Sequence, residues 1–242
     1  MSLAEKFGWH VPMTESLKSL PAAYPDTSSH NFKDLIWSYK SKHSYVADCA
    51  LLEGDFQQAI TSAREVVRAS LDYFFGEWRP RVANKLSDNP YDWFCNSPEA
   101  LFWASSLGDW KAVTALSQFP RVPPKWEWPD HAYFALLGFF LRGESLDDHQ
   151  LAIEFILSKK KQQTRLLLEC LRALSVRDTA RFQTAWETYM DHFLKRERKK
   201  DQVDLFQSRN GSFYAFAAKH YQLHLSIPER FGDYVVQLPQ NR

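Results

Sequence analysis

A chain of 242 residues is long enough for one large domain or two small ones, with a substantial buried core. Its apolar (45%) and charged (24%) fractions exclude an intrinsically disordered protein, and a formal net charge of +1 provides no global field for binding nucleic acid or membrane. Only eight glycines are present, which is few for the corners of a β-sandwich or barrel. The composition therefore favours an all-α fold.

The three cysteines, Cys49, Cys95 and Cys170, are widely spaced, and none belongs to a C-x-x-C pair. This pattern argues against a disulfide framework and a zinc knuckle, and it favours a reducing, cytoplasmic compartment. The N-terminus does not have the pattern of a signal peptide, and the longest apolar stretch, residues 132–141, is too short to span a bilayer. We therefore expect a cytoplasmic protein without a membrane partner, in which Cys49 and Cys170 are small core residues.

Two regions differ in character along the chain. Residues 1–29 contain three prolines and many Ser and Thr, which predicts a leader that lies on the surface or is partly irregular. Residues 30–242 are predicted to form one helical-hairpin domain with an extended C-terminal tail. Its first helix spans residues 32–53, and Gly54-Asp55 separates it from an amphipathic helix over residues 56–74.

The middle of the chain repeats this pattern of helix, short break and helix. Ser97 as N-cap and Pro98 at the first helical position predict a helix that stops at Gly108. Asp109 opens the next helix, and a proline-rich loop follows over residues 120–129.

The periodicity is clearest in the helix after Asp178, where seven apolar residues fall on one face: Phe182, Ala185, Trp186, Tyr189, Met190, Phe193 and Leu194. The basic run that ends this helix, residues 195–200, is interpreted as a solvated helix C-terminus whose cations offset the helix dipole, with a nucleic-acid patch as the alternative. The further predicted segments are helices over residues 131–141, 147–157, 161–176 and 212–225, and an extended tail over residues 228–239.

The breaks between helices recur at a regular spacing. They fall at Gly54-Asp55, Gly108-Asp109, Gly143-Glu144 and Arg177-Asp178, and the last three are separated by 35 and 34 residues. Such a period is typical of arrays in which each helical hairpin buries its apolar face against the next. We therefore predict an all-α array of antiparallel helical hairpins.

The motifs of metalloproteases, serine hydrolases and nucleotide-binding enzymes are not found in the sequence. His220 and His224 are spaced to share one helical face, but a zinc site needs a third ligand that the sequence does not supply. Asp147 and Asp148 precede a predicted helix and are interpreted as capping residues rather than acid–base groups. We expect no catalytic residue, no metal and no cofactor.

Two loops contain aromatic residues that suit either binding or packing. In the loop at 123–130, Trp126 fits an exposed recognition residue and a buried plug equally well, whereas Trp128 is expected to be buried, with Asp130 capping the next helix. Tyr91, in the other long loop, has the same two interpretations.

Four segments resemble the bacterial immunity-49 family, whose members protect against toxins of polymorphic and type VI secretion systems. The resemblance covers about residues 37–238 and rests mostly on core and turn residues. It is carried by the Gly54-Asp55-Phe56 turn with its two helices; by Trp93, Pro98, Leu101, Ala104, Gly108 and Asp109; by Asp130, Tyr133, Leu136, Gly138, Phe139 and Gly143; and by Ile227, Pro228, Asp233, Tyr234, Leu238 and Pro239.

The resemblance implies an immunity protein that binds a cognate toxin protein and blocks its active site or its folding. The family's motifs fix no toxin-contacting position, so contacts are predicted from physics. Toxins that attack nucleic acids have basic clefts, which acidic groups in loops and at helix starts would complement. Trp126 and Tyr91 are the predicted aromatic anchors, and the predicted acidic contacts are Asp88, Asp92, Glu127, Asp130, Glu144, Asp147 and Asp148.

Two other functions remain open from the sequence. The first is a helical-repeat adaptor that binds a peptide or a chaperone client in a concave groove. The second is a helical enzyme or nucleic-acid-processing factor that uses the basic run at 195–200, although no direct nucleic-acid partner is expected.

Overall fold

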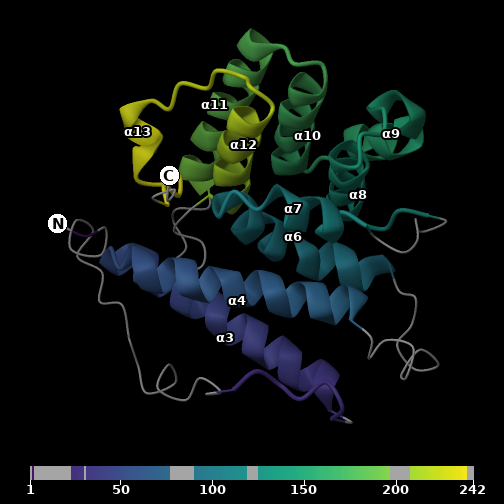
Figure 1. Ribbon diagram of the computed structural model, residues 1–242. Helices are drawn as coiled ribbons and strands as arrows, with labels where there is room; N and C mark the ends of the chain where they lie inside the picture. The colour runs from purple at the N-terminus through teal and green to yellow at the C-terminus, as the bar shows by residue number, and fades with distance from the viewer. Residues whose placement is uncertain are drawn as a thin grey trace. The chain divides into compact units, whose positions relative to one another are not determined.

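The computed structural model describes residues 2, 23–29, 31–76, 90–118, 125–196 and 208–238, with only the backbone for residues 90–96 (Figure 1). Every regular element in these ranges is a helix, which confirms the all-α prediction. The chain divides into two compact units, residues 1–87 with 237–242, and residues 88–236.

The first unit is built on one antiparallel pair, α3 (Phe32–Glu53) and α4 (Phe56–Phe75), at the positions that the sequence predicts. Tyr24, which precedes the pair, packs its ring edge-on against Tyr39, and its hydroxyl donates a hydrogen bond to Asp72. The described part of the leader therefore lies against this hairpin.

In the described residues of the second unit, the hairpin pattern continues with nine elements. They are α6 (Pro90–Ser106), α7 (Trp110–Leu116), α8 (Pro129–Leu141), the 3₁₀ turn η1 (Leu146–His149), α9 (Gln150–Ser158), α10 (Gln162–Ser175), α11 (Thr179–Arg196), α12 (Arg209–His220) and α13 (Glu229–Gly232).

All four predicted breaks are confirmed, and each contains one residue in the left-handed conformation. Three of these residues are glycines, at 54, 108 and 143, with φ between 71° and 81°; the fourth is Arg177, with φ of 55°. In each turn the following residue donates its N–H to a carbonyl five positions earlier, as Asp55 does to Ala50 at 2.8 Å and Asp178 does to Ala173 at 3.0 Å. This is the Schellman pattern, which satisfies the last carbonyls of a helix. The same bond joins Leu223 to Ala218 beside Gln222, so a fifth turn ends α12.

An aspartate directly after the left-handed residue starts the next helix in three of these turns. Its carboxylate accepts a hydrogen bond from the N–H three positions on, in Asp55, Asp109 and Asp178, at 2.9–3.0 Å. The two-residue sequence thus closes one helix and caps the next.

Aromatic rings fill the core of the second unit. Trp103, Trp186 and Tyr189 are almost completely buried. The hydroxyls of Tyr133 and Tyr214 lie 2.7 Å apart, and that of Tyr214 donates to the carbonyl of Leu167 at 2.9 Å, so side chains and backbone from α8, α12 and α10 meet in one chain of hydrogen bonds. Cys170 is buried as predicted, as is Cys49 in the first unit, and both thiols are free.

The starts of α6 and α8 differ from the prediction. The helix expected to begin at Pro98 begins at Pro90, and Pro98 lies inside it. An internal proline removes one backbone hydrogen bond, but the buried turns that follow Pro98 hold the helix together. Asp130 does not cap its helix, because α8 starts at Pro129, two residues before the predicted His131, with Trp128 as N-cap residue.

Trp128 is 61% exposed, so the prediction that it is buried is wrong. A residue before proline is pushed into the extended region, and Trp128 has φ of −123° and ψ of 135°. Trp126 is half-buried, which lies between its two sequence interpretations.

The C-terminal part of the second unit differs as well. Helix α12 begins at Arg209 and ends at His220, earlier than the predicted 212–225, because Ser208 caps its start and the turn at Gln222 ends it. His224 therefore lies beyond the helix and does not share a helical face with His220. The predicted extended tail contains the short helix α13.

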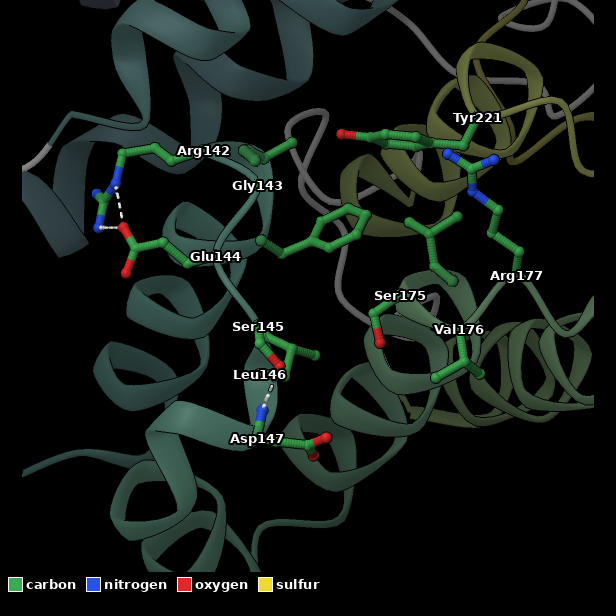
Figure 2. A pocket seen from close by; sticks show the side chains of 13 residues that line it. Arg142, Gly143, Glu144, Ser145, Leu146, Asp147, Ser175, Val176, Arg177 and Tyr221 are labelled. Atoms are coloured by element: carbon green, nitrogen blue, oxygen red, sulfur yellow. Dashed lines mark hydrogen bonds and ion pairs between the residues drawn. The ribbon is translucent and has the colours of Figure 1, made fainter.

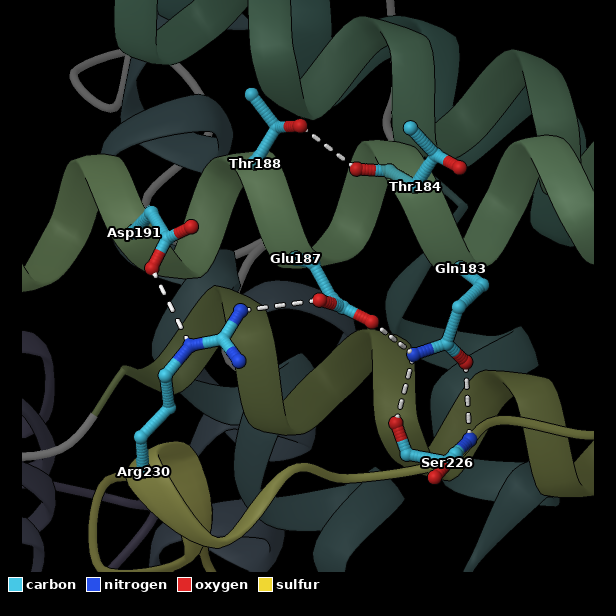
Figure 3. A network of polar contacts seen from close by, with 7 residues as sticks. All are labelled: Gln183, Thr184, Glu187, Thr188, Asp191, Ser226 and Arg230. Atoms are coloured by element: carbon cyan, nitrogen blue, oxygen red, sulfur yellow. Dashed lines mark hydrogen bonds and ion pairs between the residues drawn. The ribbon is translucent and has the colours of Figure 1, made fainter.

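The segment around α13 is attached to α11 by both polar and apolar contacts. Gln183 exchanges two hydrogen bonds with the backbone of Ser226, at 2.8 and 2.9 Å, and Arg230 pairs with Glu187 at 3.0 Å (Figure 3). Phe231 is fully buried, with its ring centroid 5.5 Å from that of Trp186 and nearly perpendicular to it.

Burial of Phe231, rather than the ion pair of Arg230, is expected to hold this segment. Phe231→Ala should lower the free energy of unfolding by about 3–5 kcal/mol, because it leaves a cavity in a packed site. Arg230→Ala should cost less than about 1 kcal/mol, because its side chain is half-exposed and its ion pair is screened. Urea denaturation of both variants measures the difference, and an equal loss for the two would contradict this ranking.

The left-handed turn at Gly143 can be tested without a steric complication, since a Cβ there would meet nothing within 4 Å. Gly143→Ala should lower the free energy of unfolding by about 1–2 kcal/mol through backbone conformation alone. Gly232→Ala is the matched control, because Gly232 has equal space and no left-handed φ, and it should lose no stability. The two losses are compared by thermal and urea unfolding.

Candidate functional site

An open hollow of about 620 Å³ lies in the second unit, where α8 and α10 end and α12 ends beside them. Its apolar lining comes from these helix ends and from η1, and its polar lining comes from the turns that follow α8 and α10 (Figure 2). The apolar residues are Phe140, Leu141, Leu146, Leu174 and Val176, with Tyr221 at one side. The left-handed turns therefore place residues far apart in the sequence around one space.

An aromatic group borders the hollow on the α12 side. The ring of His220 stacks on that of Trp110, with centroids 4.0 Å apart. The ring of Tyr221 contacts that of Phe140, with centroids 5.0 Å apart. Burial lowers the pKa of His220 and raises that of Tyr221, whereas the charge of Arg177 acts to lower the pKa of Tyr221. Because Tyr221 keeps its proton at neutral pH, its hydroxyl can donate a hydrogen bond into the hollow.

The wall formed by the turn after α8 carries a fixed ion-pair network. Arg142 donates to Glu144 through Nε at 2.8 Å and Nη2 at 2.6 Å, and to the carbonyl of Ser117 at 2.8 Å. The other oxygen of Glu144 lies 3.2 Å from Nε2 of His149, whose ring stacks on Phe139 with centroids 3.6 Å apart. Glu144 therefore shapes the turn with both of its oxygens.

Asp147 and Asp148 follow on η1 and are exposed. The backbone N–H of Asp147 donates to the Ser145 hydroxyl at 3.2 Å, and its carboxylate lines the hollow (Figure 2). Within the described ranges, neither carboxylate accepts a hydrogen bond or joins an ion pair. Beside the hollow, these two carboxylates are thus open to a partner.

The predicted contact residues fall at two ends of α8. Trp126, Glu127 and Asp130 lie at its start, whereas Glu144, Asp147 and Asp148 follow its end. A helix of 13 residues is about 20 Å long, so the two groups do not form one cluster. Asp130 is moreover held by the Lys161 ammonium and the Thr164 hydroxyl. Asp88 lies outside the described residues, and so do the side chains of Tyr91 and Asp92.

Arg177 and Tyr221 line the hollow but were not predicted as contacts. The available signal was the position of Arg177, which takes the place that glycine has in the other predicted breaks. Nothing in the sequence indicates that Tyr221 lies near this turn.

The described residues contain no group of three His, Cys, Asp or Glu side chains that could hold a metal ion. Burial raises the pKa of the Cys49 thiol to about 11 and also raises the pKa of Cys170, so both are protonated at neutral pH. Among the described helices, none has the length and apolar character needed to cross a membrane.

No family model, no curated protein and no solved structure matches the chain. The resemblance to the immunity-49 family therefore stays a prediction from the sequence, and the function has to be argued from the hollow.

Proposed function

We propose that this chain is an immunity protein that binds and neutralises a cognate antibacterial toxin by protein–protein inhibition. The observation that carries the proposal is the open hollow bordered by Asp147 and Asp148, whose exposed carboxylates have no partner within the described part of the chain. The resemblance of the sequence to immunity-49 proteins supports the same class. The toxin is expected to act on nucleic acids, because such a toxin has a basic cleft, which the carboxylates of Asp147 and Asp148 would complement.

The physical role of Asp147 and Asp148 in this proposal is electrostatic steering. Carboxylates on an exposed rim raise the association rate with a basic surface and favour one orientation of the complex. The apolar floor beside them, which includes Leu146 and the 67% exposed Val176, supplies area that is buried on binding.

The second candidate is an adaptor that binds a peptide or a chaperone client. The same hollow favours it, because apolar residues between polar turns suit an extended peptide. The two functions differ in partner: an immunity protein has a toxin encoded beside it, whereas an adaptor needs no toxic neighbour.

Co-expression with the product of the adjacent gene tests the proposed function. We expect the neighbouring protein to be toxic alone, the chain to rescue growth, and the two proteins to co-purify. A neighbour that is harmless, or one whose toxicity the chain leaves unchanged, would contradict the immunity function and favour the adaptor.

Charge reversal tests the role of Asp147 and Asp148, which form the acidic rim of the hollow. Asp147→Lys with Asp148→Lys should slow association with the toxin by about tenfold or more at low salt, and the effect should shrink as salt rises, because steering is screened. Asp147→Lys alone and Glu127→Lys are the matched comparison, since each reverses one exposed carboxylate, at opposite ends of α8, and Glu127→Lys should have the smaller effect. Surface plasmon resonance at two ionic strengths measures both, and equal effects would exclude the hollow as the binding face.

A further inference from the structure

Arg177 occupies a backbone position that favours glycine. Its φ of 55° is left-handed, and the equivalent position in the turns after α3, α6 and α8 is glycine. A side chain at this position is disfavoured, because its Cβ crowds the backbone. An arginine at this strained position therefore points to a role of its side chain that glycine could not fill.

That side chain lines the hollow. Figure 2 shows the guanidinium of Arg177 beside the ring of Tyr221, across the hollow from Glu144 and Asp147. No hydrogen bond or ion pair joins this guanidinium to any residue in the described ranges, whereas Arg142 on the opposite wall is held by Glu144 and the Ser117 carbonyl. Arg177 therefore offers open donors to a molecule that enters the hollow.

The hollow thus has two poles of opposite charge. Asp147 provides an open carboxylate at η1, and Arg177 provides an open cation at the turn after α10, with an apolar floor between them. A guanidinium binds a carboxylate through two parallel hydrogen bonds, a geometry that suits an Asp or Glu side chain.

We propose that Arg177 forms a carboxylate-binding subsite in this hollow, which receives an acidic side chain of the partner protein. That the partner is a toxin rests on the proposed function. An acidic rim alone would attract many basic proteins, and a cation beside it rejects those that lack a carboxylate at the matching position. Arg177 is then a specificity-determining residue, whereas Asp147 and Asp148 govern association.

The competing explanation is structural. The C-terminal end of α10 carries a partial negative charge, which a cation at Arg177 would offset. The two roles predict opposite changes in stability for Arg177→Gly. If the side chain serves a ligand, glycine relieves the left-handed backbone and Tm rises by about 2–4 °C. If it serves the helix end, Tm falls.

The experiment uses the full chain and two small probes of equal shape, benzoate and its neutral analogue benzamide. Benzoate should shift the NMR signals of the Arg177 side chain and of the neighbouring turn amides with a dissociation constant on the order of millimolar, and benzamide should not. Arg177→Gly should abolish the benzoate shifts while raising Tm. Gln222→Gly is the matched control, because Gln222 also has a left-handed φ without being glycine and does not line the hollow; it should raise Tm and leave benzoate binding unchanged.

Three results would overturn the inference: equal shifts with benzamide, benzoate shifts that persist in Arg177→Gly, or a lower Tm for that variant. The titration needs no toxin, so its outcome is separate from that of co-expression. If rescue fails while benzoate binds through Arg177, the immunity function is contradicted and the carboxylate subsite is supported.

Discussion

The left-handed residue at the end of α3, α6, α8, α10 and α12 is the constraint on which the rest of the structure depends. It reverses the chain within two residues and satisfies the last carbonyls of the helix through backbone N–H groups. Three of the five turns then start the next helix with an aspartate cap, so that neither helix end relies on water or on a long loop. Within the second unit the same geometry brings the ends of α8 and α10 and the residue after α12 around one hollow.

Local features of the sequence predicted four of these five turns, and in two of them Gly followed by Asp acts through backbone φ and one side-chain hydrogen bond. The turn at Gln222 carries no such signal, so the predicted helix ran on to residue 225. The errors arose where a local signal did not decide the structure. Pro98 resembles a helix start, but α6 begins at Pro90 and continues through Pro98. The sequence predicts that Trp128 is buried, yet this residue precedes Pro129 with an extended backbone and its side chain is 61% exposed.

The candidate site was predictable only in part, for a related reason. Asp147 and Asp148 stand out because they follow a turn and precede a helix, which are local properties. The two poles of the hollow come from turns more than 25 residues apart, and only the packing of α8 against α10 places Arg177 opposite Asp147. The prediction also grouped Glu127 with Asp147, because a sequence does not show that a full helix separates them.

The buried hydroxyls of Tyr133 and Tyr214 have a consequence for how the second unit is assembled. The Tyr214 proton goes to the Leu167 carbonyl, so Tyr133 has to be the donor in the bond between the two rings, and the chain of bonds has a single direction. Burial raises the pKa of both tyrosines well above the usual value, so neither proton is lost at any pH near neutrality. A slide of α8, α10 or α12 along its axis by one turn, about 5.4 Å, would leave buried polar atoms unsatisfied. The directed hydrogen bonds therefore select one axial position of α8, α10 and α12 relative to one another. The apolar faces of these helices alone would allow several such positions.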